Sequence, residues 1–308
     1  MNKMKKIAVT GATGMIGAAL VRYALSKGIE VLCITRKNSG RLNNLPKSDL
    51  MKIEYCDIDQ YGSLALDVNY DVFYHFAWDK TSNFYRDDVD TQTANIRYTL
   101  DALLLAKRMG CKKFIGAGSQ AEYGRVSGTI SSDMGVAPDS AYGVAKYAAG
   151  RLSAILAEQL DIEHIWTRIF STYGINDMDS TMISYCIRSL LNKEMPKLTR
   201  CEQIWDYLYC DDAAKAFYLL GENGKNRKVY NIGSGIAKSL KEYVETIRNA
   251  IDPNLPLGIG EREYAPMQVM HLCADISELQ KDTGFQPYTS FENGIKKTVE
   301  WYRTRLQT

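Results

Sequence analysis

A glycine loop near the start of the chain constrains the fold more than any other stretch. Residues 5–10 form a short apolar, β-branched run that predicts a strand, and residues 18–25 have the composition of a helix. Between them lie Gly11, Gly14 and Gly17, whose spacing is one residue longer than the dinucleotide-binding pattern G-x-G-x-x-G. Free N–H groups and the positive end of a helix dipole would meet at this turn, and both attract an anion such as a pyrophosphate. The alternative is an ordinary corner between a strand and a helix.

Apolar strands alternate with amphipathic helices through the first half of the chain. Further strands are predicted over residues 30–35, 51–56, 71–77, 113–117 and 164–170, and long helices over residues 91–109 and 141–160. Strands that are apolar almost throughout belong in a parallel sheet with helices on both faces. We therefore predict an α/β fold with a Rossmann-type doubly wound parallel sheet over residues 1–174. Strands and helices should return to that domain from about residue 202 to 235, and residues 175–308 should form a smaller, interleaved α/β substrate lobe.

The composition argues against several classes of partner and site. A formal net charge of +2 over 308 residues gives no reason to expect a nucleic acid partner. No stretch approaches the ~20 consecutive apolar residues of a membrane span, so we expect no membrane association. The seven cysteines are scattered without a C-x-x-C pair, and the chain has three histidines. We therefore expect neither a disulfide framework nor a metal site, and we expect a cytoplasmic location.

Three side chains suggest proton-transfer chemistry. Tyr142 and Lys146 lie four residues apart at the start of a predicted helix, so they share one helix face. A phenol has a pKa near 10, and a neighbouring ammonium group would lower that pKa toward the working range. Ser119 follows the strand predicted over residues 113–117, so its hydroxyl would face the crevice where parallel sheets bind ligands. The set could serve a carbonyl/alcohol couple beside a nicotinamide; a surface tyrosine–lysine pair and a serine that caps a strand are the alternatives.

Together with the glycine loop, these residues resemble the extended short-chain dehydrogenase/reductases, and within them the NAD-dependent epimerase/dehydratase family. Shorter matches run along nearly the whole chain, at Asp57-Ile58, His75-Phe76-Ala77, Asn95, Tyr123-Gly124, Arg168, Tyr173-Gly174, Asp211-Asp212, Tyr230-Asn231-Ile232-Gly233 and Trp301-Tyr302. The resemblance implies that the first half holds NAD(P) and that the second half holds most of a nucleoside-diphosphate sugar. It implies Tyr142 as the acid/base, Lys146 as its electrostatic partner and Ser119 as a hydroxyl donor.

The same resemblance implies a wider set of binding residues. The cofactor would contact Gly11, Thr13, Gly14, Met15, Ile16, Gly17, Arg36, Asp57, Ile58, Phe76, Ala77, Asn95, Tyr142, Lys146 and Ile169. The sugar nucleotide would contact Trp78, Gln120, Ser171, Gln203, Trp205 and Arg262. Trp205 could equally be a core residue. Many relatives carry an arginine for the substrate phosphates at position 205, so Arg200 or Arg262 is a candidate replacement, and either could be a surface charge instead.

The residues after the second strand bear on the choice of cofactor. NAD binders usually place a carboxylate there for the ribose hydroxyls, whereas this chain has Arg36 and no carboxylate in residues 35–39. A guanidinium accepts a 2′-phosphate. We therefore expect NADP to be preferred over NAD. The alternative is that Arg36 stacks on the adenine and that both cofactors bind.

Departures from the family pattern narrow the expected reaction. Dehydratases of the family carry an acidic pair directly after the serine position, where this chain has Gln120 and Ala121, so we do not expect dehydration. Residues 118–124 and 205–209 resemble 4-ketoreductases of the CDP-abequose and CDP-paratose synthase type. We therefore expect a 4-ketoreductase. A nucleotide-sugar 4-epimerase with retained NAD and a non-catalytic NAD(P)-sensing protein are the alternatives. The helices over 91–109 and 141–160 form a dimer interface in many relatives, which implies a homodimer.

Overall fold

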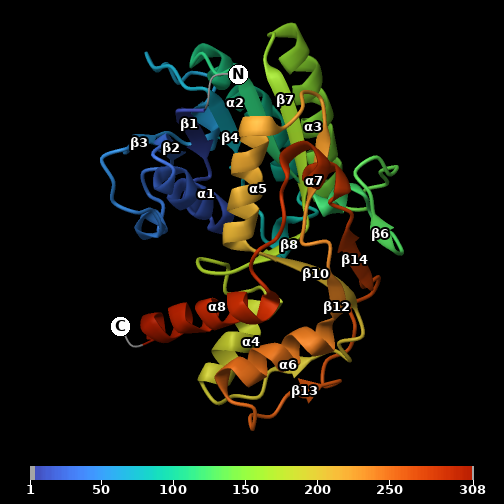
Figure 1. Ribbon diagram of the computed structural model, residues 1–308. Helices are drawn as coiled ribbons and strands as arrows, with labels where there is room; N and C mark the ends of the chain where they lie inside the picture. The colour runs from blue at the N-terminus through green and yellow to red at the C-terminus, as the bar shows by residue number, and fades with distance from the viewer. Residues whose placement is uncertain (1–3, 307–308) are drawn as a thin grey trace.

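The main sheet of the protein has seven parallel strands, in the order β11-β7-β5-β4-β1-β2-β3. The computed structural model describes residues 4–306 (Figure 1). The strands of the sheet are β1 (Lys6–Thr10), β2 (Glu30–Thr35), β3 (Met51–Tyr55), β4 (Val72–His75), β5 (Lys113–Ser119), β7 (Glu163–Ile169) and β11 (Val229–Ile232). The predicted Rossmann-type doubly wound sheet is therefore confirmed.

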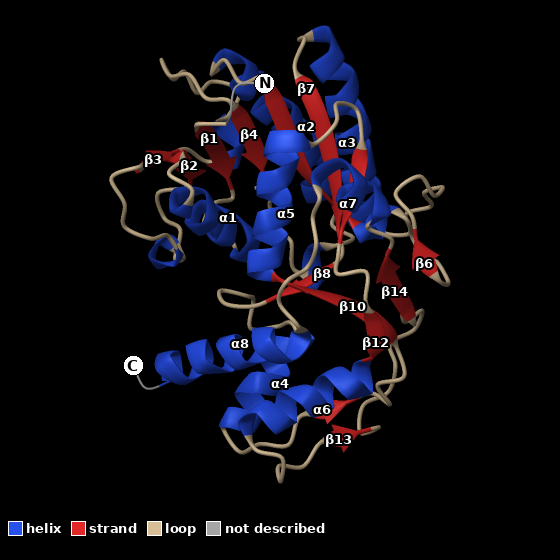
Figure 2. Cartoon of the chain, in the orientation of Figure 1, coloured by secondary structure: helices blue, strands red, loops and turns tan. Residues whose placement is uncertain are grey.

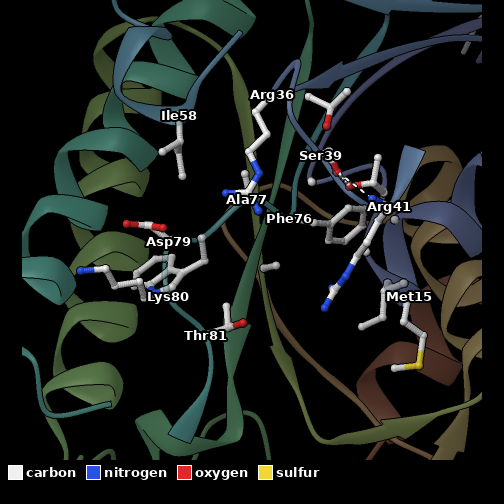
Figure 3. Close-up of a pocket in the computed structure, with 18 of the residues that line it drawn as sticks. Met15, Arg36, Ser39, Arg41, Ile58, Phe76, Ala77, Asp79, Lys80 and Thr81 are labelled. Carbon is white, nitrogen blue, oxygen red and sulfur yellow. Dashed lines mark hydrogen bonds between the residues drawn. The ribbon is translucent and has the colours of Figure 1, made fainter. Parts of the chain in front are cut away.

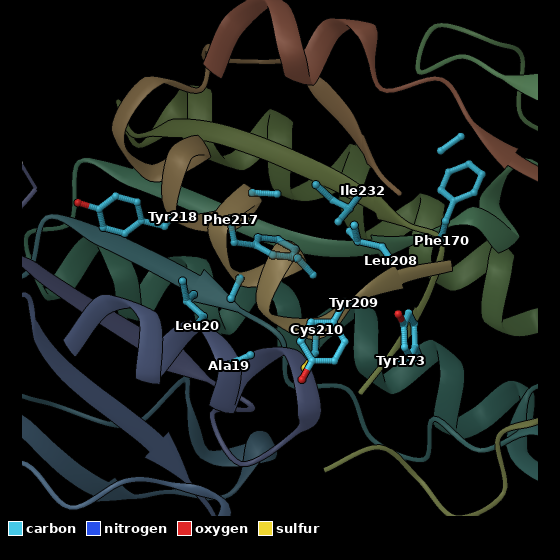
Figure 4. Packing of buried hydrophobic residues seen from close by; sticks show 14 of the residues in the cluster. Ala19, Leu20, Phe170, Tyr173, Leu208, Tyr209, Cys210, Phe217, Tyr218 and Ile232 are labelled. Atoms are coloured by element: carbon cyan, nitrogen blue, oxygen red, sulfur yellow. The ribbon is translucent and has the colours of Figure 1, made fainter. Parts of the chain in front are cut away.

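Helices cover both faces of this sheet. The helices α1 (Met15–Ser26) and α5 (Cys210–Asn223) pack on one face, and α2 (Val89–Arg108) and α3 (Ala141–Gln159) pack together on the other. Alternate residues of a strand point to opposite faces. Ile7 and Val9 of β1 accordingly join the core that contains Leu20 of α1 and Phe217 of α5, whereas Ala8 joins the core under α2. Figure 4 shows the first of these cores at close range.

The order of the strands reverses between β1 and β4, and the glycine loop lies at this point. The chain runs from β1 outward to β2 and β3, and then crosses back to β4 on the other side of β1. Open parallel sheets bind their ligands in the crevice that such a reversal leaves at the carboxyl ends of the strands. Gly11 follows β1 with a φ of +66°, and a Cβ atom there would lie 2.7 Å from the backbone nitrogen of Ala77. A Cβ atom on Gly17 would lie 2.3 Å from the Gly11 carbonyl oxygen, so both positions require glycine.

A second, smaller group of elements lies beyond the carboxyl ends of the main sheet. Its five-stranded sheet has the order β12-β10-β14-β6, with β8 paired to β10. These strands are β6 (Thr129–Ile130), β8 (Ser171–Tyr173), β10 (Ile204–Tyr209), β12 (Ala237–Ser239) and β14 (His271–Ala274). The helices α4 (Met182–Leu191), α6 (Leu240–Ile251) and α8 (Phe291–Leu306) pack against one another there (Figure 2). The short elements β9 (Lys197–Leu198), β13 (Gly258–Ile259), α7 (Ser277–Thr283), η1 (Leu42–Asn44), η2 (Ile58–Gln60), η3 (Asn83–Tyr85) and η4 (Gln120–Glu122) complete the fold.

The segment predicted to return to the first domain divides between the two sheets. Helix α5 covers the main sheet and β11 forms one edge of it, whereas β10 belongs to the second sheet. Strands of the two sheets therefore alternate along this part of the chain.

The questions of membrane-spanning helices, metal sites and cysteine pairing concern residues 4–306 as a whole. Within residues 4–306, no helix combines the length and the apolar character needed to cross a membrane. The same residues contain no group of three or more His, Cys, Asp or Glu side chains that could hold a metal ion. The seven cysteines all lie in this part of the chain, where they are buried free thiols.

Candidate active site

A pocket of about 1180 Å³ opens at the carboxyl ends of the strands of the main sheet. It gathers the glycine loop after β1, the loop after β2, the segment after β4, the end of β5 and the start of α3. Figure 3 shows side chains from several of these segments around one space. Segments far apart in the sequence therefore meet at the strand-order reversal.

The structure brings most of the predicted site residues to this pocket. All three predicted catalytic residues line it, as do the predicted cofactor residues other than Asn95: Gly11, Thr13, Gly14, Met15, Ile16, Gly17, Arg36, Asp57, Ile58, Phe76, Ala77, Ser119, Tyr142, Lys146 and Ile169. Of the predicted substrate residues, Trp78 lines it, whereas Gln120, Ser171, Gln203, Trp205 and Arg262 do not.

The N-terminus of α1 forms the part of the pocket suited to phosphate. Gly14 is the N-cap residue, in an extended conformation, and Met15 and Ile16 are the first helical residues. The first N–H groups of a helix have no partner within it, and the helix dipole adds partial positive charge there. Thr13 bonds the Ser39 hydroxyl across the loop at 3.3 Å. The glycine loop is thus held as an anion cradle that fits the pyrophosphate of a dinucleotide.

Two arginines enter the pocket from the loop after β2. Arg36 and Arg41 both line it, and both are labelled in Figure 3. Ser39 lies between them and accepts a hydrogen bond from the Arg41 backbone N–H. Residues 35–45 contain no carboxylate. Sequence reasoning identified Arg36 and missed Ser39 and Arg41, although a second arginine five residues after the first was a visible signal.

The start of α3 places Tyr142 at the pocket. The Ser140 hydroxyl caps the helix by accepting the Gly143 N–H, and the Arg86 carbonyl accepts the Tyr142 N–H at 2.8 Å. The Arg86 guanidinium also lies over the Tyr142 ring, 4.7 Å from its centroid. Ser119, the last residue of β5, is close enough to hydrogen-bond the phenol.

The predicted effect of Lys146 on the phenol is wrong for this structure. Burial raises the pKa of Tyr142 above its usual value, and the hydrogen bond with Ser119 and the charge of Arg86 oppose that rise. The Lys146 Nζ lies 5.8 Å from the Tyr142 ring centroid, and it donates a hydrogen bond of 2.6 Å to the Ala117 carbonyl. Lys146 directs its ammonium group to the Ala117 carbonyl, and the loss of water around Tyr142 outweighs the effect of the neighbouring Arg86 charge on the phenol pKa.

Lys146 is itself strongly affected by its surroundings. The residue is 3% exposed, and burial lowers the pKa of its ammonium group to about 7. The negative charge of Glu122 raises the same pKa but does not outweigh burial. The Lys146 Nζ also lies 3.6 Å from the ring centroid of Trp78.

The segment after β4 is fastened to α2 by two amide side chains. Asn95 accepts the Asp79 N–H at 2.7 Å and donates to the Asp79 carbonyl at 3.2 Å. Gln92 accepts the indole N–H of Trp78 at 2.9 Å and donates to the Tyr85 carbonyl at 2.8 Å. Asn95 therefore supports the wall of the pocket from behind, and Gln92, which sequence reasoning missed, does the same one turn earlier.

A buried ion pair supports Ser119 from behind the pocket. Glu122 is fully buried, and its carboxylate accepts the Ser119 N–H at 2.9 Å and the Trp166 indole N–H at 3.0 Å. Arg168 donates to the same carboxylate at 2.8 Å. Arg168 also lies over the Tyr123 ring, 4.3 Å from its centroid. This network fixes the backbone at the end of β5.

The structure does not bring the remaining predicted substrate residues to the pocket. The Trp205 indole N–H donates to the Ser171 hydroxyl at 2.7 Å, because β10 and β8 pair in the second sheet. Gln203 is buried, Arg262 is exposed, and Gln120 begins the turn η4. From the loop after β8 the pocket instead receives Asp177, whose pKa burial raises to about 6. Nothing in the sequence around Asp177 indicated this placement.

Comparisons with known proteins identify the family and the fold of this chain. A family model described as NAD dependent epimerase/dehydratase family matches residues 7–233. The chain is 24% identical over 331 residues to the dTDP-glucose 4,6-dehydratase of Neisseria meningitidis serogroup B, a match that covers 97% of this chain and 93% of that protein.

Solved structures show the same fold. The UDP-N-acetylglucosamine 4-epimerase from Methanobrevibacter ruminantium M1, in complex with UDP-N-acetylmuramic acid, superposes with a TM-score of 0.88 at 24% identity, over 98% of this chain and 99% of that one. The dTDP-glucose 4,6-dehydratase DesIV from Streptomyces venezuelae, solved with NAD bound, has a TM-score of 0.87 at 21% identity and covers 98% of each chain.

Proposed function

The chain belongs to the NAD-dependent epimerase/dehydratase family, and on that premise we propose that it reduces the C4 ketone of a nucleoside-diphosphate sugar. One observation carries the proposal: the glycine cradle at α1 and the Ser119, Tyr142 and Lys146 side chains line one pocket. A dinucleotide bound in that cradle would supply the hydride. The relatives that support a sugar-nucleotide substrate include a dTDP-glucose 4,6-dehydratase and a UDP-N-acetylglucosamine 4-epimerase.

The roles of the side chains follow from their positions. The N-terminus of α1 would hold the pyrophosphate, and Asp57 and Ile58 would lie against the adenine. Tyr142, whose raised pKa keeps the phenol protonated at neutral pH, would give its proton to the oxygen that becomes the C4 hydroxyl. Ser119 would hydrogen-bond that oxygen, and Lys146 would hold ribose hydroxyls with its ammonium group.

Dehydration fits this site poorly. The positions after Ser119 are Gln120 and Ala121, which carry no carboxylate. The carboxylate of Glu122 is nearby, but both of its oxygens are occupied, one by Ser119 and Trp166 and the other by Arg168. It therefore cannot replace the missing acidic pair.

The loop after β2 supports NADP as the preferred cofactor. Arg36 and Arg41 enter the pocket from a loop without carboxylates, and Ser39 lies between them. A 2′-phosphate would find two guanidinium groups and a hydroxyl there. DesIV is solved with NAD bound, so this preference is a proposal for this chain.

A 4-epimerase is the second candidate, favoured by the structural likeness to UDP-N-acetylglucosamine 4-epimerase. The two reactions differ in what the purified protein contains. A reductase releases no NAD on denaturation, and it consumes NADPH in the presence of a 4-keto sugar nucleotide. An epimerase carries bound NAD and turns over without added reductant. A protein that binds NAD(P) but shows neither behaviour would be the non-catalytic sensor, and that result would reject the proposal.

We also propose a homodimer through α2 and α3. Val144, Leu152 and Ile155 expose about half of their surface on one face of α3, and Val89 is exposed at the start of α2. Burial of such an apolar face against a second copy would stabilise a four-helix contact.

A further inference from the structure

Trp78 contacts two of the side chains that line the pocket, Lys146 and Tyr142. Its ring lies 3.6 Å from the Lys146 Nζ, and it meets the Tyr142 ring edge to face with centroids 6.0 Å apart. The residue is 9% exposed and lines the pocket. Its one polar atom is turned away from the pocket toward Gln92, so it presents carbon to Lys146.

We propose that Trp78 is a positioning residue for Lys146, which holds the ammonium group charged and in place, and that Gln92 fixes the indole for this purpose. Trp78 was expected from the sequence to contact the sugar. The contacts of its ring and its N–H favour this second role instead.

The donors of Lys146 support the proposal. An ammonium group has three N–H donors and no acceptor. One donates to the Ala117 carbonyl at 2.6 Å, and the indole face lies on a second side at 3.6 Å. A third donor remains for the pocket. Trp78 and Ala117 together therefore leave Lys146 one direction in which to meet a ligand.

The charge of Lys146 also depends on what surrounds it. The groups that face it are Glu122 from η4, His75 from β4, Tyr142 from its own helix, and the Trp78 ring. His75 is neutral because burial lowers its pKa to about 3, and Glu122 is already paired with Arg168. An aromatic face attracts a cation but not a neutral amine, so Trp78 offsets part of the burial that favours the neutral form.

Gln92 holds the indole of Trp78 in one orientation. Its carbonyl oxygen accepts the indole N–H, while its amide nitrogen donates to the Tyr85 carbonyl on the segment that Trp78 begins. Both ends of the amide are occupied, so the plane of the indole is set by α2. Loss of Gln92 should free the ring without removing it.

The test measures NADPH binding by its fluorescence across pH, with no sugar present. The inference rests on the proposed function only for the use of Lys146 in turnover. A binding measurement without the sugar therefore tests the role of Trp78 independently of whether the protein is a reductase. In the wild type, affinity should fall as Lys146 loses its proton. In Trp78→Leu the midpoint of that fall should move about one pH unit lower, and in Trp78→Phe it should move less. Trp301→Phe, which removes an indole from α8, should leave the pH midpoint of NADPH binding unchanged.

A second readout uses the emission of Trp78 itself. The tryptophan emission of the wild type should change with the same midpoint, and this change should vanish in Trp78→Phe and Lys146→Met but persist in Trp301→Phe. In Gln92→Leu the amplitude of this pH-dependent emission change should fall. An unshifted binding midpoint in Trp78→Leu, or an emission change that survives in Trp78→Phe, would overturn the proposal. A raised KM for the sugar with an unshifted midpoint would return Trp78 to the role of a substrate contact.

Discussion

The carboxylate of Glu122 and the guanidinium of Arg168 form a buried ion pair, with 2.8 Å between Oε2 and Nε, directly behind Ser119. The pair belongs to the support of the site rather than to the pocket, since neither residue lines it. Its charge still reaches the pocket, because Glu122 raises the pKa values of both Tyr142 and Lys146.

Glu122→Gln should therefore shift the pH dependence of the reaction. Glutamine keeps an acceptor for the Ser119 and Trp166 N–H groups but removes the negative charge, and Arg168 is left uncompensated. The pKa values of Tyr142 and Lys146 should both fall, so the alkaline limb of kcat/KM should move to lower pH. Glu122→Gln and Arg168→Met each leave one buried charge unpaired, so each should also cost about 3–5 kcal/mol of unfolding free energy. An unshifted alkaline limb in Glu122→Gln would show that the pair only supports the fold.

Tyr142→Phe should abolish turnover and spare cofactor binding. The phenyl ring can keep the contacts with Trp78 and with Arg86, so the helix start should remain in place. Loss of the proton donor should lower kcat by about 10²- to 10⁴-fold. Tyr147→Phe is the matched control, because Tyr147 lies on the same helix but does not line the pocket. Wild-type activity in Tyr142→Phe would remove the proposed mechanism.

Arg36 and Arg41 should decide between the two cofactors. Replacing either by alanine should weaken NADPH binding about 10- to 100-fold and leave NADH binding nearly unchanged, since each removes one charge-assisted contact. Titration calorimetry with both reduced cofactors measures this. Lys37→Ala removes a neighbouring charge that does not line the pocket and should change neither affinity. Equal losses for NADH and NADPH would instead indicate that the arginines contact the shared part of the cofactor.

Two buried histidines should make the protein sensitive to acid. Burial lowers the pKa of His75 to about 3 and that of His164 to about 4. In the unfolded chain both would titrate near the ordinary value of ~6.5, so the unfolded state binds more protons below that pH and stability falls as the pH decreases. Each histidine should remove about 2 kcal/mol of unfolding free energy at pH ~5 relative to neutral pH.

Urea unfolding at the two pH values measures this loss. In His164→Gln the loss between neutral pH and pH ~5 should be smaller by about half of the histidine contribution. If His164→Gln lost as much stability between the two pH values as the wild type, the acid sensitivity would not come from His164.

The proposed dimer predicts a change of mass from one substitution. Ile155→Glu places a charge in the middle of the exposed apolar face of α3, and the protein should then run as a monomer in light scattering. Tyr55→Glu, at an equally exposed site on β3, should keep the mass of the wild type. A wild-type chain that is already monomeric at micromolar concentration would reject the dimer.

The sequence was most informative where the pattern is local. The predicted strands match β1 to β5 and β7, and the helices over 91–109 and 141–160 match α2 and α3, to within a few residues. The strand predicted over 113–117 was two residues too short. In the structure Gly116 and Gly118 lie against the Trp166 side chain, which occupies the space of their missing Cβ atoms, and β5 continues to Ser119. The neighbouring strand β7 therefore supplies the side chain that packs against the last residues of β5.

By itself, the sequence determined that a glycine turn joins a strand to a helix and that Tyr142 and Lys146 share a helix face, since these follow from backbone conformation and helix periodicity. Only the tertiary structure decided that Arg41 and Asp177 enter the pocket and that Trp205 does not. It also decided that the pKa of Tyr142 is raised rather than lowered, because burial and long-range contacts depend on how distant segments pack. The spacing of residues along a chain specifies which face of a helix or strand each side chain occupies. The side chains that pack against that face come from other parts of the chain, so the sequence pattern alone does not identify them.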